Sequence, residues 1–241
     1  MNNSNGPTEA LPRQQARSTR LLPWIFLVLG TTSGIWVLGA RGGFPTWQGF
    51  PNTAVTSLFF LGAAATVARP VPSRHRWGVV AGLLFSALGD LFLLLPQDRF
   101  VAGLTSFLAA HLCYLWAFTG DHRLAQRPLS FALWGVAGLV LLPWLWPGIA
   151  GPLRLPVVVY TAALLAMAAQ AAGRAYSHRN LAAVMAAAGA ALFVASDALL
   201  AIQRFRHPLE GGRLWVLGTY FAAQAGIALS VVLFRRPTPN A

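Results

Sequence analysis

Eight apolar segments, each about 19–22 residues long, recur along the chain and are separated by short polar gaps. A segment of this length crosses a hydrocarbon layer of about 30 Å as an α-helix. The interior of a bilayer offers backbone groups no water, so segments that span it fold as helices. We therefore expect an all-α fold, a polytopic membrane helix bundle with eight transmembrane helices. The expected segments are 21–40, 50–68, 77–95, 100–118, 129–147, 153–172, 181–202 and 214–234.

Polar residues flank this apolar region at both ends of the chain. Residues 1–20 include two prolines and three arginines, so we expect them to form a disordered cytoplasmic tail. Residues 235–241 are expected to form a second, short cytoplasmic tail, with one eight-helix membrane domain, 21–234, between the two. The first segment ends in small residues, as signal peptides do, but its length and the following Arg41 are typical of a retained helix.

The positive charge is spread over the gaps between the segments. The net charge is +12, and all eighteen basic residues are arginines. Cytoplasmic loops carry an excess of basic residues, and scattered arginines do not form the patch that nucleic acid requires. We therefore expect both termini to be cytoplasmic, and the partners to be membrane lipids rather than nucleic acid. Twelve arginines fall in the tails and the gaps 69–76, 119–128 and 173–180, against six in the gaps 41–49, 96–99, 148–154 and 203–213.

Two aspartates lie inside apolar segments, Asp90 in the third and Asp197 in the seventh. An ionisable group at membrane depth costs from about 2.5 to more than 10 kcal/mol, which makes it a candidate functional group. Each aspartate precedes the end of its segment by about six residues on the same expected side, which is a depth of roughly 9 Å at 1.5 Å per residue. We expect the two carboxyl groups to meet in one site. The four other acidic residues lie in gaps or tails, where we expect solvated carboxylates.

Other polar side chains fall on the same helical faces or at the same depth as the aspartates. Residues four apart share a helix face, as Ser86 and Asp90 do in the third segment. Each of these residues also has a purely structural interpretation, as a packing aromatic or a local hydrogen-bonding group. Two aspartates and one histidine on three helices do not have the spacing typical of a metal site, so we expect no metal. The expected pocket residues are Ser86, His111, Tyr114, Tyr160, Ser196, Tyr220 and Gln224.

With these residues in view, the sequence resembles the YhhN family of integral-membrane lysoplasmalogenases. The similarity extends from about Phe50 to Leu233, and Arg69-Pro70 stands where the family has Lys-Pro. The motifs that carry it are FSALGD (85–90), F-x-x-G-x-x-x-F-x-x-x-H-x-x-Y (100–114), Y-x-x-x-L-x-x-M (160–167), GAALFVASD (189–197) and GTYFAAQ (218–224).

The resemblance implies hydrolysis of the vinyl ether bond of a lysoplasmalogen, or of a related ether lysolipid, to a fatty aldehyde and a glycerophospho-alcohol. It implies catalytic roles for Asp90 and Asp197 and pocket roles for His111, Tyr160 and Tyr220. Protonation of the β-carbon of a vinyl ether gives an oxocarbenium ion that captures water. This needs a protonated acid and a carboxylate beside the cation, which two neighbouring carboxyl groups provide without a cofactor. Which aspartate donates the proton stays open, with Asp197 favoured by its more apolar neighbours.

Two other functions remain open. An intramembrane aspartyl protease also pairs two membrane aspartates, but usually in Tyr-Asp and Gly-x-Gly-Asp, whereas here Ser196 precedes Asp197 and Ala87-Leu88-Gly89 precedes Asp90. A proton-coupled transporter would use membrane carboxylates as a proton relay. The short tails and the arginine bias suit a multi-pass protein of a bacterial inner membrane, while the sequence leaves the oligomeric state undetermined.

Overall fold

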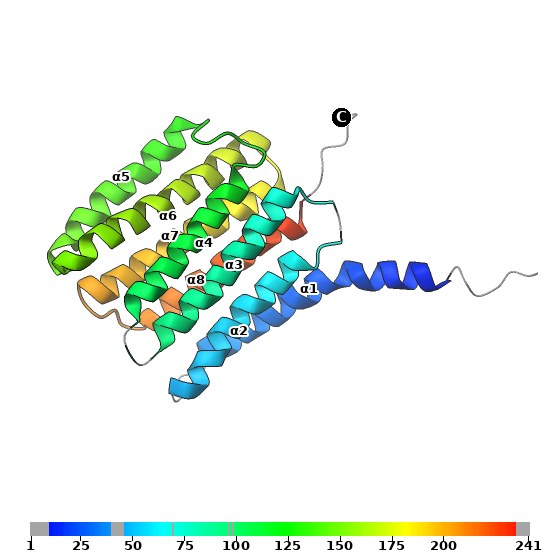
Figure 1. The fold of residues 1–241 in the computed structure, drawn as a ribbon, viewed down its shortest axis with the longest axis horizontal. Helices are drawn as coiled ribbons and strands as arrows, with labels where there is room; N and C mark the ends of the chain where they lie inside the picture. The colour runs from blue at the N-terminus through cyan, green and yellow to red at the C-terminus, as the bar shows by residue number, and fades with distance from the viewer. Residues whose placement is uncertain (1–9, 40–45, 69, 96, 98, 235–241) are drawn as a thin grey trace, which may run out of the picture.

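The fold is an up-and-down bundle of eight α-helices (Figure 1). The computed structural model describes residues 10–39, 46–68, 70–95, 97 and 99–234, with side chains from residue 20 onward except those of 46–52. The helices are α1 (Ala10–Gly39), α2 (Thr46–Ala65), α3 (Ser73–Leu94), α4 (Phe100–Phe118), α5 (Pro128–Leu145), α6 (Gly151–His178), α7 (Leu181–Phe205) and α8 (Gly212–Val232). Consecutive helices run antiparallel, and each packs against the next except α4, which packs against α6 rather than α5. Both ends of the described chain lie on the same side of the bundle (Figure 1).

The expected all-α fold of eight helices is confirmed. Seven of the helices in the described part of the chain are long and apolar enough to cross a membrane. Of the second, α2, the residues with described side chains that belong to the helix are Thr53–Ala65, an apolar stretch. α1 begins at Ala10, so the expectation of a disordered tail over 1–20 is wrong for its second half (Figure 1). The cytoplasmic location of both termini stays a prediction.

Small residues allow the closest helix contacts. At the α7–α8 interface, Gly189 faces Gly226, and a Cβ added to Gly189 would lie 2.7 Å from the carbonyl oxygen of Ala223. Close backbone approach of this kind drives helix association in lipid. On α3, a Cβ added to Gly89 would lie 2.6 Å from the ring of Phe107. α7, which carries Asp197, is therefore held against α8, and α3, which carries Asp90, is held against α4.

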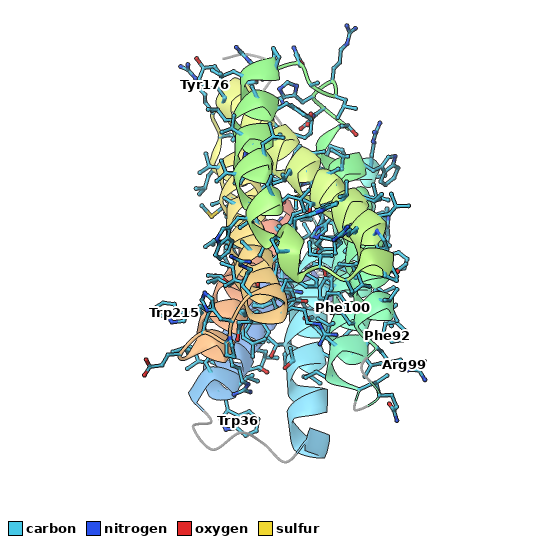
Figure 2. The ribbon with its side chains drawn as sticks, turned by 90° about the vertical axis from the view of Figure 1, so that its left-hand side faces the viewer. Trp36, Phe92, Arg99, Phe100, Tyr176 and Trp215 are labelled. Carbon is cyan, nitrogen blue, oxygen red and sulfur yellow. The ribbon has the colours of Figure 1, made fainter. Side chains whose placement is uncertain are left out.

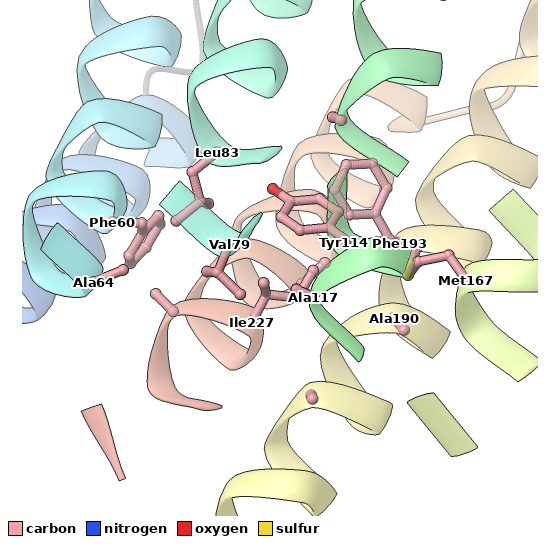
Figure 3. Packing of buried hydrophobic residues seen from close by; sticks show 14 of the residues in the cluster. Phe60, Ala64, Val79, Leu83, Tyr114, Ala117, Met167, Ala190, Phe193 and Ile227 are labelled. Atoms are coloured by element: carbon pink, nitrogen blue, oxygen red, sulfur yellow. The ribbon is translucent and has the colours of Figure 1, made fainter. Parts of the chain in front are cut away.

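The centre of the bundle is α8 rather than α7. A segment as rich in Ala and Gly as the seventh is expected in the middle of a bundle, because small residues allow close helix contacts. In the structure 28% of the apolar window of α7 is buried, against 56% for α8. One face of α7 packs into the core, where Ala186, Ala190 and Phe193 are fully buried, and its other face is not covered by other helices. Figure 3 shows Phe193 beside Tyr114 in the core that this face helps to form.

Local sequence signals end the helices around the α5–α6 and α6–α7 connections. Pro143 lies in the last turn of α5, and a short 3-10 helix, η2 (Trp146–Gly148), follows, which agrees with the stop that Pro143 and Pro147 predict. α6 ends at His178 and is followed by Arg179, which adopts a left-handed conformation with φ 48°. The Asn180 side chain then accepts a hydrogen bond of 2.9 Å from the Ala183 amide and caps α7.

Exposed tryptophans mark both ends of the bundle, as expected of an interfacial belt. Trp36 and Trp215 are more than half exposed at one end, and Trp77 is similarly exposed near the start of α3. Figure 2 shows Trp36, Trp215 and Arg99 at the lower end of the molecule and Tyr176 at the upper end.

An ion pair between a buried arginine and a partly exposed aspartate lies at the end of the bundle that we expect to be cytoplasmic. The Arg174 guanidinium, 1% exposed, donates through Nε and Nη2 to the two carboxylate oxygens of Asp121, both at 2.7 Å. The expectation that Asp121 is a solvated loop carboxylate is therefore wrong. Burial raises the pKa of Asp121, but the hydrogen bonds and the charge of Arg174 lower this pKa by more, so it lies below its ordinary value.

Candidate active site

An elongated apolar cavity lies among α4, α5, α6 and α7. Its volume is about 810 Å³, including its open side. Its wall is almost entirely aliphatic and aromatic, and the polar side chains in it are those of Tyr160, Thr161 and Asp197. α5 closes one side with Ala137, Gly138, Leu141 and Leu145. The cavity therefore presents one acidic group to an otherwise apolar volume.

Asp197 sits in a compact cluster with one residue from α6 and one from α4. The Tyr160 hydroxyl donates a hydrogen bond of 2.5 Å to Oδ2 of Asp197. Nε2 of His111 lies 3.0 Å from the Tyr160 oxygen and 3.4 Å from the same carboxylate oxygen. Because the tyrosine proton points to Asp197, the His111 contact requires a proton on Nε2. The three side chains thus form a chain of donors that ends on the carboxyl group.

The His111 ring is held by packing. It is fully buried and lies edge-on to Tyr160 and Phe193, with ring centroids 5.2 and 4.9 Å apart. Its second nitrogen, Nδ1, has no hydrogen-bond partner among the described residues. The predicted residues His111, Tyr160 and Asp197 therefore do come together.

Asp90 belongs to a second cluster, built from α2, α3 and α8. Its Oδ2 accepts hydrogen bonds from Ser57 Oγ at 2.6 Å and from Tyr220 Oη at 2.8 Å. Gln224, one turn along α8, donates to the same tyrosine oxygen. Asp90 is 6% exposed and does not line the cavity. The carboxyl group is thus enclosed by hydroxyl donors.

Aromatic rings stand between the two clusters. Phe193 packs edge-on against Tyr220 on one side, at 5.4 Å between ring centroids, and against His111 on the other. Phe107 packs against both Phe193 and Tyr220 and itself lines the cavity. Among the described residues no hydrogen bond or ion pair joins Asp90 to Asp197. The expectation that nearly all the polar side chains face one cavity is wrong, because Tyr160 and Asp197 line it and the other predicted residues do not.

The remaining predicted pocket residues take structural roles in these contacts. Ser86 and Tyr114 share a hydrogen bond of 3.2 Å, and the Tyr114 ring covers Gly82 on the neighbouring helix. Ser196 donates to the Val216 carbonyl oxygen at 3.0 Å and so ties α7 to α8.

Sequence reasoning missed Ser57, the shortest contact of Asp90. Ser57 lies four residues after Thr53, and both side chains are buried, so a polar pair at helical spacing in the second apolar segment was the available signal. No group of three or more His, Cys, Asp or Glu side chains with metal-binding geometry occurs in the described part of the chain.

Known proteins resemble this chain over most of its length. The model of the YhhN family matches residues 51–231. A Mycobacterium bovis protein named Lysoplasmalogenase is 36% identical over 192 residues, 77% of this chain and 71% of that protein. A Sus scrofa protein named Lysoplasmalogenase TMEM86B is 32% identical over 241 residues, 96% of this chain and 98% of that protein.

A more distant relative shares the family name. The Escherichia coli protein named Uncharacterized membrane protein YhhN is 27% identical over 211 residues, 87% of this chain and 99% of that protein. No solved structure matches the chain. The match to the family model and the relatives above 30% identity each cover more than two thirds of the sequence, and the chain therefore belongs to the YhhN family.

Proposed function

We propose that this protein is an integral-membrane hydrolase that cleaves the vinyl ether bond of lysoplasmalogen-type lipids. Relatives that bear the name lysoplasmalogenase support the substrate class. The observation that carries the proposal is the Asp197 carboxyl group in the wall of an otherwise apolar cavity, hydrogen-bonded to Tyr160 and backed by His111. A one-chain lipid places an acid-labile bond next to a hydrocarbon tail, which is what such a cavity accommodates.

The cavity suits the alkenyl chain of the substrate. The side chains of Leu104, Leu141, Leu164 and Val194 offer the chain an apolar surface. The tail passes from one apolar environment, the lipid, to another, so its burial supplies little hydrophobic binding energy and its contribution is to fix position. A tail held in this cavity places the vinyl ether against Asp197.

The reaction requires a single carboxyl group that acts twice. Protonated Asp197 transfers its proton to the β-carbon of the vinyl ether, and the double bond becomes an oxocarbenium ion. The carboxylate that remains stabilises this cation and then accepts a proton from the water that attacks the α-carbon. The resulting hemiacetal transfers its hydroxyl proton to the glycerol oxygen as the carbon–oxygen bond breaks, which releases the aldehyde and the glycerol alcohol.

Tyr160 and His111 position this carboxyl group. Both approach Oδ2 of Asp197, so Oδ1 is the oxygen that carries the transferred proton. The tyrosine hydrogen bond strengthens when the carboxyl group becomes anionic, because a charge-assisted hydrogen bond is stronger than a neutral one. The cluster therefore stabilises the ionised state that forms during the reaction.

In this proposal Asp90 does not contact the substrate and acts through neighbouring side chains. The original hypothesis of a proton-sharing dyad is not supported, because Phe193 and Phe107 stand between the clusters. Asp90 instead orients Tyr220, whose ring supports Phe107 in the cavity wall. We infer that Asp90 is a positioning residue.

The deciding experiment incubates the purified protein with a 1-alkenyl lysophospholipid and measures free fatty aldehyde. We expect aldehyde from the vinyl ether, and none from the matched lysolipids with a saturated alkyl ether or an acyl ester. Asp197→Asn is expected to lower the rate of aldehyde release by about 10²–10⁴, while Ser196→Ala, at the neighbouring position, retains turnover. A folded wild-type protein that yields no aldehyde would contradict the proposal.

A further inference from the structure

Three arginines lie over aromatic rings near the end of the cavity that we expect to be non-cytoplasmic. The Arg204 guanidinium lies 4.8 Å over the ring of Phe100, which lines the cavity. Arg206 lies 4.9 Å over Trp144, and Arg154 lies 5.0 Å over Trp146. In the sequence, the two tryptophans stand on either side of Leu145, and Arg204 and Arg206 stand on either side of Phe205. Both Leu145 and Phe205 line the cavity.

These arginines do not follow the charge pattern of the rest of the chain. The gap at 203–213 holds three arginines, whereas the other gaps on the arginine-poor side hold one each. An excess of arginine on the non-cytoplasmic side opposes the expected topology, so setting the topology does not account for it. Two of the three, Arg204 and Arg206, lie over Phe100, which lines the cavity, and over Trp144, next to the lining residue Leu145. Their position therefore points to a ligand.

The geometry of α7 links Arg204 to Asp197. The two residues are seven apart, which is two helical turns, so they share a face about 10.5 Å apart along the axis at 1.5 Å per residue. Ala201 lies between them and lines the cavity. In a lysoplasmalogen the vinyl ether and the phosphate are attached to opposite ends of a three-carbon glycerol. A lipid with its vinyl ether at Asp197 therefore directs its phosphate toward Arg204.

Guanidinium groups are suited to this ligand. A guanidinium held over an aromatic ring by a cation–π contact still has several N–H donors, and these match the oxygens of a phosphate. We propose that Arg204, with Arg154 and Arg206 beside it, binds the phosphate of the lysolipid substrate at the cavity end. This proposal rests on the proposed function. Because the contact is to the phosphate, ethanolamine and choline lipids are both accepted.

The test compares a 1-alkenyl glycerophosphoethanolamine with a 1-alkenylglycerol of equal chain length, which lacks the phosphate. Both are assayed in detergent micelles without phospholipid, with aldehyde release as the readout. In the wild type we expect kcat/KM to favour the phosphate substrate at least tenfold. In Arg204→Gln this preference falls at least tenfold through KM, and Arg204→Lys restores part of it. Arg213→Gln, from the same gap, serves as the matched control and keeps the full preference.

Other outcomes identify what is wrong. If Arg204→Gln alters turnover in phospholipid bilayers but not in micelles, the arginines contact bulk lipid, and the proposed site is refuted. The same holds if the wild type cleaves both substrates equally. Free glycerophosphoethanolamine should inhibit the wild type competitively and the Arg204→Gln variant less. If the wild type releases aldehyde from neither substrate, the hydrolase itself is refuted, which is a different result.

Discussion

The Tyr160 hydroxyl and the Asp197 carboxylate are joined by a hydrogen bond of 2.5 Å at the wall of the cavity. The tyrosine rises from α6 and the aspartate from α7, and the tyrosine is almost fully buried. A donor fixed in this way holds the carboxyl group in one orientation before the substrate arrives. Pre-organised donors of this kind stabilise charge that develops in a transition state.

Replacement of Asp197 tests whether it is the acid. Asp197→Asn keeps the shape but removes the transferable proton, so we expect kcat to fall by about 10²–10⁴. Tyr160→Phe should cost less, about tenfold, because the acid is still present but less well held. Aldehyde release by variants with a wild-type elution profile in size-exclusion chromatography is the measurement. Turnover near that of the wild type in Asp197→Asn would refute the mechanism.

Replacement of Asp90 separates the positioning role from a shared-proton dyad. Asp90→Asn leaves Ser57 and Tyr220 with an imperfect partner, so we expect a loss of about 1–3 kcal/mol in stability. Its kcat should fall less than tenfold, with an unchanged pH profile. Ser57→Ala, which removes one donor to the same oxygen, should behave alike. A folded Asp90→Asn variant as inactive as Asp197→Asn would restore the dyad.

Isotope labelling tests where the proton and the water go. If Asp197 protonates the β-carbon, hydrolysis in D₂O places one deuterium on the carbon next to the aldehyde carbonyl. Because water attacks the α-carbon, oxygen-18 from water should be absent from the glycerophospho product. Mass spectrometry of both products, with rapid trapping of the aldehyde, provides the measurement. Oxygen-18 in the glycerol product would mean attack at the glycerol carbon and a different reaction.

The fold was predictable because segment length and hydrophobicity decide which segments span a membrane. The cluster of His111, Tyr160 and Asp197 was partly predictable too, because position along a helix sets the height of a side chain. The depth of a side chain along its helix does not determine whether it points toward a side chain at the same depth on a helix that it does not contact. The separation of Asp90 from Asp197 depends on Phe193 and Phe107, which in sequence are ordinary core residues. The ion pair between Arg174 and Asp121 was not predicted either, because Arg174 was counted only as one of the arginines that set the topology.

The ion pair between Asp121 and Arg174 predicts a pH-dependent stability. The pKa of Asp121 in the folded protein lies below its ordinary value of about 4, so the pair stabilises the fold above that pH. This contribution is lost as the pH falls through the folded-state pKa. Asp121→Asn leaves a buried cation unpaired, and we expect a loss below the roughly 3–5 kcal/mol of fully buried pairs, because the carboxylate is partly exposed.

Thermal unfolding in detergent at pH 7 and at pH 3 measures this effect. The melting temperature of Asp121→Asn should be clearly lower than that of the wild type at pH 7, and the gap should narrow at pH 3. Glu210→Gln, at an exposed loop carboxylate, is the control and should match the wild type at both pH values. An equal gap at the two pH values would show that the carboxylate charge is not the cause.

The far end of the cavity sets the longest chain that the proposed enzyme accepts. Ala137 and Leu165 line this end, about two turns of α5 from Leu145. Ala137→Phe fills the space, so we expect at least a tenfold loss of kcat/KM for the longest alkenyl chains and little change for chains four to six carbons shorter. Val136→Phe, at the neighbouring position with 58% of its surface exposed, adds the same ring outside the cavity and is the matched control. A uniform loss across chain lengths in Ala137→Phe would place the tail elsewhere, because only a blocked tail discriminates by length.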